Sequence, residues 1–173
     1  MKRDPFSYVY LQEGKCDKID DVNDEKEWKE VLSAMEVLGL KEEEKEFFWK
    51  IIASILLLGN LEFGEEDRGQ HHAAVVNNVE VLKLIANNLE IDEKVLFSAL
   101  TTKTLVTGQK KLNVPQQKKE ALISRDSFAK DLYSYLFDRV VFIINRSIQV
   151  TTKSKGEDEE SYKRIGVLDI YGL

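Results

Sequence analysis

The sequence has little of the chemistry that marks secreted or membrane-spanning proteins. Its 173 residues include one cysteine, Cys16, so no disulfide can form within the chain. No apolar run is long enough to span a bilayer or to act as a secretory signal near the amino terminus. These absences predict a protein of a reducing compartment, and we expect the cytoplasm.

The sequence is also poor in residues that bind metals or act as nucleophiles. Its two histidines, His71 and His72, are adjacent, and neighbouring side chains cannot both face one metal ion without an unusual turn. Cys16 lies between Lys15 and Asp17 with no histidine nearby, which favours an ordinary solvent-side or half-buried thiol over a catalytic one. Neither a histidine metal centre nor cysteine–histidine catalysis is expected.

The net charge of −6, from 25 basic and 31 acidic residues, argues against binding to nucleic acid or to an anionic membrane surface. One segment departs from this trend. Residues 101–119 contain no acidic side chain and five lysines, which are Lys103, Lys110, Lys111, Lys118 and Lys119. A local basic patch of this kind suits an acidic partner surface.

What the sequence does contain is helical periodicity, in a chain that is 43% hydrophobic and long enough for one sizeable core. Asn23 or Asp24 can cap the first helix, which Gly39 would end, and Asp92 can cap a later one. The last helix would run roughly 50 Å, and its apolar part, residues 140–144, is expected to be buried. Helices are expected over residues 23–39, 41–58, 78–89, 92–100 and 116–148.

Few segments have the composition of strands. We expect a short strand at residues 61–63, an exposed polar loop over residues 64–74, and a two-stranded ribbon with a loose turn over residues 102–114. Residues 153–163 are predicted to form a solvated loop before a last strand at residues 165–172. The expected fold class is therefore mainly α, an α+β fragment made of one helical subdomain with a long helix, a small β-ribbon and a carboxyl-terminal strand.

Two short motifs raise the question of phosphate binding. Residues 64–71 have the glycine spacing of a phosphate-binding loop, but Gln70 stands where the lysine belongs, and three acidic residues would repel a polyphosphate. This segment is interpreted as an acidic surface loop. Asp169 and Gly172, at the carboxyl end of the last strand, remain the plausible ligand-contacting pair, and the alternative there is a buried strand that ends in a turn.

Four motifs, taken in order, resemble the motor domain of the myosins, with class I myosins the most similar. Residues 10–13 (YLQE) are similar to the family's YLNQ segment, and residues 55–63 (ILLLGNLEF) resemble its ILHLGN segment and the phenylalanine that follows. Residues 125–130 (RDSFAK) resemble RDALAK, and residues 166–172 (GVLDIYG) match switch II as far as its glycine. Their order and separations make the resemblance specific, and it covers nearly the whole chain.

The resemblance implies a nucleotide role for the last strand. Asp169 would help to hold Mg²⁺ through a water molecule, and the Gly172 amide would donate a hydrogen bond to the γ-phosphate of ATP. Alone, these two residues lack the lysine, hydroxyl and arginine partners that phosphoryl transfer requires. The isolated chain is therefore expected to hold neither ATP nor Mg²⁺ and to be inactive as an enzyme.

The resemblance also implies that the ribbon is the actin-facing loop of the motor. The residues that would form this surface are Lys103, Gly108, Lys110 and Lys111. Lys110 occupies the position at which class I motors carry a phosphorylatable or acidic regulatory residue. Because a lysine is neither, this departure argues against regulation by phosphate at the loop.

Taken as a whole, the resemblance implies that residues 1–173 form one partial domain, the upper 50-kDa region of a myosin motor, with the last strand in its P-loop NTPase-type central sheet. The P-loop, switch I, lower half, converter and lever helix, where calmodulin-like light chains bind, would belong to the rest of the heavy chain. The parent would be an actin-activated Mg-ATPase of the actin cytoskeleton. The alternatives are a non-enzymatic helical module that binds an acidic partner such as actin, and a remnant of a decayed gene.

Overall fold

The computed structural model describes residues 4–12, 14–67, 72–108 and 110–148. These residues form a mainly helical structure with two antiparallel β-hairpins, which confirms the expected helical class and the ribbon. The solvated loop predicted at residues 153–163 and the strand predicted at residues 165–172 lie outside the described residues.

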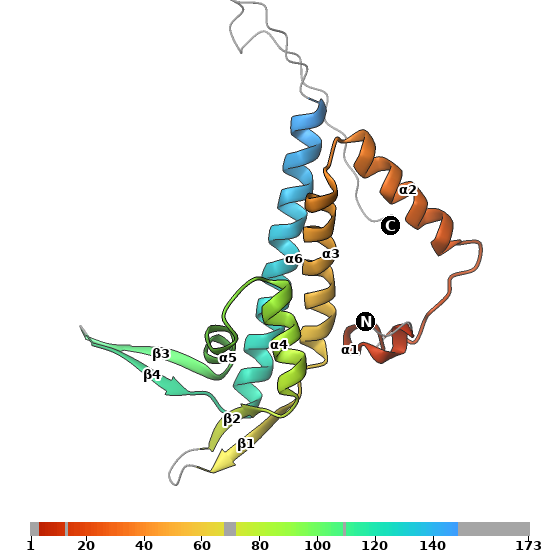
Figure 1. The fold of residues 1–173 in the computed structure, drawn as a ribbon. Helices are drawn as coiled ribbons and strands as arrows, with labels where there is room; N and C mark the ends of the chain where they lie inside the picture. The colour runs from red at the N-terminus through yellow and green to blue at the C-terminus, as the bar shows by residue number, and fades with distance from the viewer. Residues whose placement is uncertain (1–3, 13, 68–71, 109, 149–173) are drawn as a thin grey trace, which may run out of the picture.

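Two long antiparallel helices form the axis of the molecule (Figure 1). α3 (Glu42–Gly59) and α6 (Lys118–Ile148) run side by side, and α4 (Val79–Asn88) and α5 (Glu93–Thr101) pack around the end of this pair where α3 finishes. The core forms where these four helices meet. Its most deeply buried large side chains are Leu58, Leu82, Ile85, Leu96 and Leu100.

The helix ends follow local side-chain chemistry. At the start of α2 (Asp24–Val37), the Asn23 side chain accepts a hydrogen bond of 3.0 Å from the Lys26 N–H. Gly39 lies just after α2 at φ +76°, a conformation that glycine adopts without steric cost. Asp92 caps α5 by accepting a hydrogen bond of 2.7 Å from the Lys94 N–H. The capping predicted for Asn23 and Asp92 is confirmed.

The polar loop predicted over residues 64–74 is wrong, because most of its described part is a β-hairpin. β1 (Phe63–Asp67) pairs with β2 (His72–Val76) in antiparallel register, with Phe63 opposite Val76. Ala73, Ala74 and Val76 are buried, and the Ala74 N–H donates a hydrogen bond of 2.7 Å to the Gln116 carbonyl. The buried side chains of β2 and this distant carbonyl hold the hairpin against the helices.

The burial predicted for residues 140–144 is also largely wrong. Ile143 is buried, but Val141, Phe142 and Ile144 are 39%, 53% and 38% exposed. The reason is that this part of α6 extends beyond α4 and α5, and of the described helices α3 alone runs along it (Figure 1). One stripe of α6 therefore packs, and the rest of its apolar surface faces outward.

A small amino-terminal element and a second hairpin lie on opposite sides of the helical body. The 3₁₀ turn η1 (Pro5–Ser7) and helix α1 (Val9–Gln12) lie against the finishing end of α3, whereas the hairpin of β3 (Thr102–Thr107) and β4 (Lys110–Pro115) projects from the opposite side of the helical body (Figure 1). Within the part of the chain that the structure describes, no helix combines the length and the apolarity that crossing a bilayer requires.

Candidate functional site

The projecting hairpin is a tighter ribbon than the sequence suggested. β3 and β4 are antiparallel, and because Thr107 pairs directly with Lys110, two residues connect the strands rather than a loose turn. Gly108, the first of them, has φ +62°, in the left-handed region that short hairpin turns use. The chain therefore places Lys110 and Lys111 at the free end of the hairpin.

The predicted lysines of this ribbon differ in how free they are. Lys110 and Lys111 are exposed. Lys103, at the base of the hairpin, has a side chain that is 42% exposed and donates a hydrogen bond of 2.5 Å to Glu120 on α6. That bond, together with the Gln117 N–H, lowers the pKa of the Glu120 carboxyl. Lys103 thus anchors the hairpin to α6, and the available positive charge lies at the tip.

Sequence reasoning missed the apolar part of this surface. Leu105, Val106 and Leu112 are 47%, 67% and 56% exposed, although strand residues of this type are usually covered. Leu105 lies opposite Leu112 on one face of the ribbon, and Val106 lies opposite Lys111 on the other. The signal was present in the two-residue alternation of a strand, which puts apolar and basic side chains together on each face.

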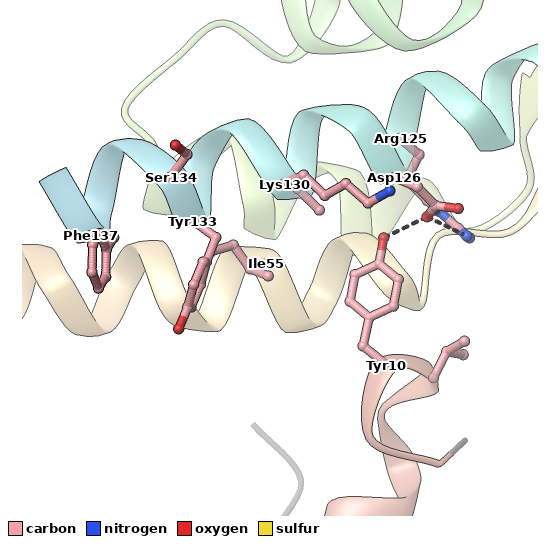
Figure 2. A pocket seen from close by; sticks show the side chains of 10 residues that line it. Tyr10, Ile55, Arg125, Asp126, Lys130, Tyr133, Ser134 and Phe137 are labelled. Atoms are coloured by element: carbon pink, nitrogen blue, oxygen red, sulfur yellow. Dashed lines mark hydrogen bonds and ion pairs between the residues drawn. The ribbon is translucent and has the colours of Figure 1, made fainter. Parts of the chain in front are cut away.

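A second feature is a half-open pocket of about 680 Å³ between α1, α3 and α6. Figure 2 shows its lining, in which Tyr10 from α1 faces Asp126 on α6, while Tyr133 and Phe137 extend from α6 across α3. Ile55 contributes from α3. The pocket therefore has a polar end and an aromatic end.

The polar end is a hydrogen-bonded cluster. The Tyr10 hydroxyl donates a hydrogen bond of 2.6 Å to Asp126 Oδ1, and Arg125 Nη2 lies 2.7 Å from the same oxygen. Arg125 Nη1 also donates to the Gly59 and Leu61 carbonyls, at 3.4 and 3.3 Å. Burial of the phenol and its bond to the carboxylate raise the pKa of Tyr10 to about 12.

The end of α3 holds α1 at this cluster. Asn60 accepts a hydrogen bond of 2.9 Å from the Val9 N–H and donates one of 2.7 Å to the Ser7 carbonyl. Gly59 permits the approach, because a β-carbon there would lie 3.0 Å from the Tyr10 ring. Sequence reasoning did not predict the cluster, although residues 10–13, 55–63 and 125–130, the motifs it singled out, meet there.

The remaining predicted site residues cannot be placed. Asp169 and Gly172 lie outside the described residues, so the predicted contacts to Mg²⁺ and ATP stay predictions. Across the described ranges, no three histidine, cysteine, aspartate or glutamate side chains come together as metal ligands would. Cys16 is an exposed free thiol, as one of the two expected environments requires. The described residues therefore do not form a metal site by themselves.

Two comparisons with known proteins, one with family models and one with individual proteins, point to the same family. The whole chain, residues 1–173, matches the family model described as myosin head (motor domain). Over 99% of its length the chain is 35% identical to unconventional myosin-Ic of Danio rerio, of which it covers 16%. Over 98% of its length it is 36% identical to Myosin-1 of Lodderomyces elongisporus and 38% identical to Myosin-16 of Arabidopsis thaliana, covering 13% of each. The chain thus spans less than a fifth of these relatives.

Proposed function

This chain belongs to the myosin motor-domain family, and from that premise we propose that it is the upper 50-kDa region of a motor whose β3–β4 hairpin contacts actin. The proposed parent is an actin-activated Mg-ATPase that moves along actin filaments of the cytoskeleton, in the cytoplasm. Within it, residues 1–173 act as one partial domain that supplies part of the actin-facing surface and the start of switch II.

One observation carries the actin proposal, namely the composition of the hairpin tip. Exposed Lys110 and Lys111 lie beside exposed Val106 and Leu112 on a ribbon that projects from the helical body (Figure 1). Positive charges steer the encounter with an acidic filament, and the apolar side chains can be buried once contact is made. A ribbon with both groups suits a reversible protein contact.

The identity of Lys110 bears on regulation of this contact. In the resemblance to class I motors, it occupies the regulatory position of the loop. Lysine cannot accept the phosphate that a serine or threonine would, so phosphorylation cannot add negative charge at this position of the tip. We therefore propose that actin contact through this hairpin is not controlled by phosphorylation at residue 110.

The nucleotide role proposed for Asp169 and Gly172 depends on the rest of the heavy chain. These two residues would hold Mg²⁺ through water and contact the γ-phosphate only when the phosphate-binding loop and switch I of an intact motor are present. The chain alone should not hydrolyse ATP. An ATPase assay with Mg²⁺ tests this, and turnover well above that of a Gly172 deletion variant would contradict it.

The rest of the heavy chain is also the proposed partner of the outward-facing apolar side chains. Trp28 on α2 and Phe142 on α6 are 46% and 53% exposed. Large exposed apolar surface marks sites that contact other protein. The isolated chain should therefore self-associate. Size-exclusion chromatography at rising concentration tests this, and a sharp monomer peak at the highest concentration would count against the proposal.

Co-sedimentation with actin filaments tests the proposed function. Binding should be clear at about 0.02 M salt and much weaker at about 0.2 M, because salt screens exposed charges beyond the Debye length. Parallel spins without filaments correct for self-association. Binding that is the same at both salt concentrations would contradict a contact made by the charged hairpin and would point to another surface, such as the exposed face of α2, which has no buried residue.

A further inference from the structure

The pocket between α1, α3 and α6 is separate from the proposed actin contact, because none of its lining residues belongs to the β3–β4 hairpin. Its volume of about 680 Å³ falls inside the range of about 300–1,000 Å³ that is usual for small-molecule sites. It is open on one side, so a ligand could enter without unfolding the chain. The side chains that line it determine which class of ligand it can bind.

The polar end carries one uncompensated positive charge. Arg125 and Asp126 are 2.7 Å apart, and the charges of this pair cancel. Lys130 is exposed, and its side chain runs along the pocket toward the same end (Figure 2). No ion pair of Lys130 is found among the described residues, whereas Arg125 and Asp126 are also bonded to their neighbours. The polar end is therefore suited to an anionic group.

The other end is suited to a flat ring. Tyr133 and Phe137, one helical turn apart on α6, are 62% and 58% exposed and line the pocket together (Figure 2). Ile55 and Ala129 add apolar surface between α3 and α6. The Tyr10 ring closes the opposite side. A planar aromatic ligand can contact these rings while its acidic group reaches Lys130.

We propose that this pocket binds a small planar aromatic anion, with the ring between Tyr10 and Tyr133 and the acidic group on the Lys130 ammonium. Such a ligand also contacts both α1 and α6. Its binding therefore holds α1 in place against the helical pair, through surfaces that the Tyr10–Asp126 bond already brings together.

The test is an NMR titration of the ¹⁵N-labelled 173-residue chain with 2-naphthoate, with neutral 2-naphthamide as the matched ligand. The chain is kept below the concentration at which size-exclusion chromatography detects self-association. For a ligand of this size in a half-open pocket, a Kd on the order of 1 mM is expected for the acid. Shifts should be confined to α1, the end of α3 and the first half of α6. The amide should bind about two- to five-fold more weakly, because it lacks the charge that pairs with Lys130.

Three variants separate the pocket from a general basic surface. Lys130→Gln should weaken the acid about two- to five-fold and leave the amide unchanged, whereas Lys119→Gln, at an exposed lysine of the same helix, should change neither. Tyr133→Ser should weaken the binding of both ligands. Because Tyr133 is exposed, this substitution should leave the fold intact. The proposal would be overturned if the acid and the amide bound with equal affinity, or if the Lys119 and Lys130 variants had equal effects. Failure of the acid titration to saturate by about 10 mM would also overturn it.

Discussion

The Tyr10 hydroxyl donates a hydrogen bond of 2.6 Å to the Asp126 carboxylate, across 116 positions of sequence. This bond joins α1 to α6, while Asn60 at the end of α3 holds the backbone at the start of α1, through Ser7 and Val9. Tyr8, just before α1, is buried. α1 itself has no buried residue, so these side-chain hydrogen bonds make its attachment to the helical pair. Changes at this junction should have measurable effects.

Replacing Tyr10 with phenylalanine should lower the free energy of unfolding by about 1 kcal/mol. The substitution keeps the ring and removes the hydroxyl that donates to Asp126, in a partly buried setting where such a bond contributes moderately. Urea unfolding followed by circular dichroism measures the change. Tyr135→Phe is the matched control, because Tyr135 is 74% exposed. Equal midpoints for the two variants would show that the bond contributes nothing to stability.

The same phenol should make stability depend on pH in the alkaline range. Its pKa is raised from 10.0 to about 12, so the folded state favours the protonated form. The associated stability is complete below pH 10, the unfolded value, and is lost as the pH rises toward 12. Absorbance titration should show a tyrosine ionisation step near pH 12, and Tyr10→Phe should remove that step. Loss of a step near pH 10 instead would contradict the assignment.

Gly59→Ala should disturb the junction from the α3 side. Alanine favours a helix over glycine by about 1 kcal/mol, but its β-carbon would lie 3.0 Å from the Tyr10 ring. The ring must move, which lengthens its bond to Asp126, so the pKa of Tyr10 should fall toward its ordinary value. Gly14→Ala is the control, because a β-carbon at Gly14 meets nothing within 4 Å. An unchanged tyrosine titration in Gly59→Ala would show that the ring is free to adapt.

Leu58→Ala should destabilise the chain by about 2–5 kcal/mol, because it removes a fully buried side chain from the core where α3 meets its neighbours. Val37→Ala, at a side chain that is 82% exposed, should change the free energy of unfolding by less than about 0.5 kcal/mol. Denaturant midpoints compare the two. Similar small effects would mean that the core around α3 is loosely packed.

Sequence reasoning succeeded where the determining contacts are local. The Asn23 and Asp92 caps act within three residues, and the spacing of apolar side chains gave the extent of α6. It failed for β1 and β2, because the acidic residues of β1 resemble a loop and the strand depends on pairing and on the distant Gln116 carbonyl. Burial of residues 140–144 was overestimated because an apolar run does not reveal how many neighbours its helix has.

At the candidate sites too, local features were predictable from the sequence and distant contacts were not. The basic hairpin was predicted from composition, but the neutralisation of Lys103 was not, because its partner Glu120 lies one residue beyond the basic segment of residues 101–119. The pocket was not predicted, since its polar end joins Tyr10 to Asp126, which are 116 positions apart in the sequence. Motif order pointed to the family, whereas three-dimensional proximity had to come from the structure.

The most direct measurement of the central claim is actin co-sedimentation of two double charge reversals at low salt. Lys110→Glu with Lys111→Glu changes the hairpin tip, and Lys83→Glu with Lys94→Glu makes the same change in charge at exposed lysines of α4 and α5. If the hairpin contacts actin, the tip variant should lose several-fold in affinity and the control should bind nearly as the parent chain does. Equal losses, or a tip variant that binds normally, would contradict the account.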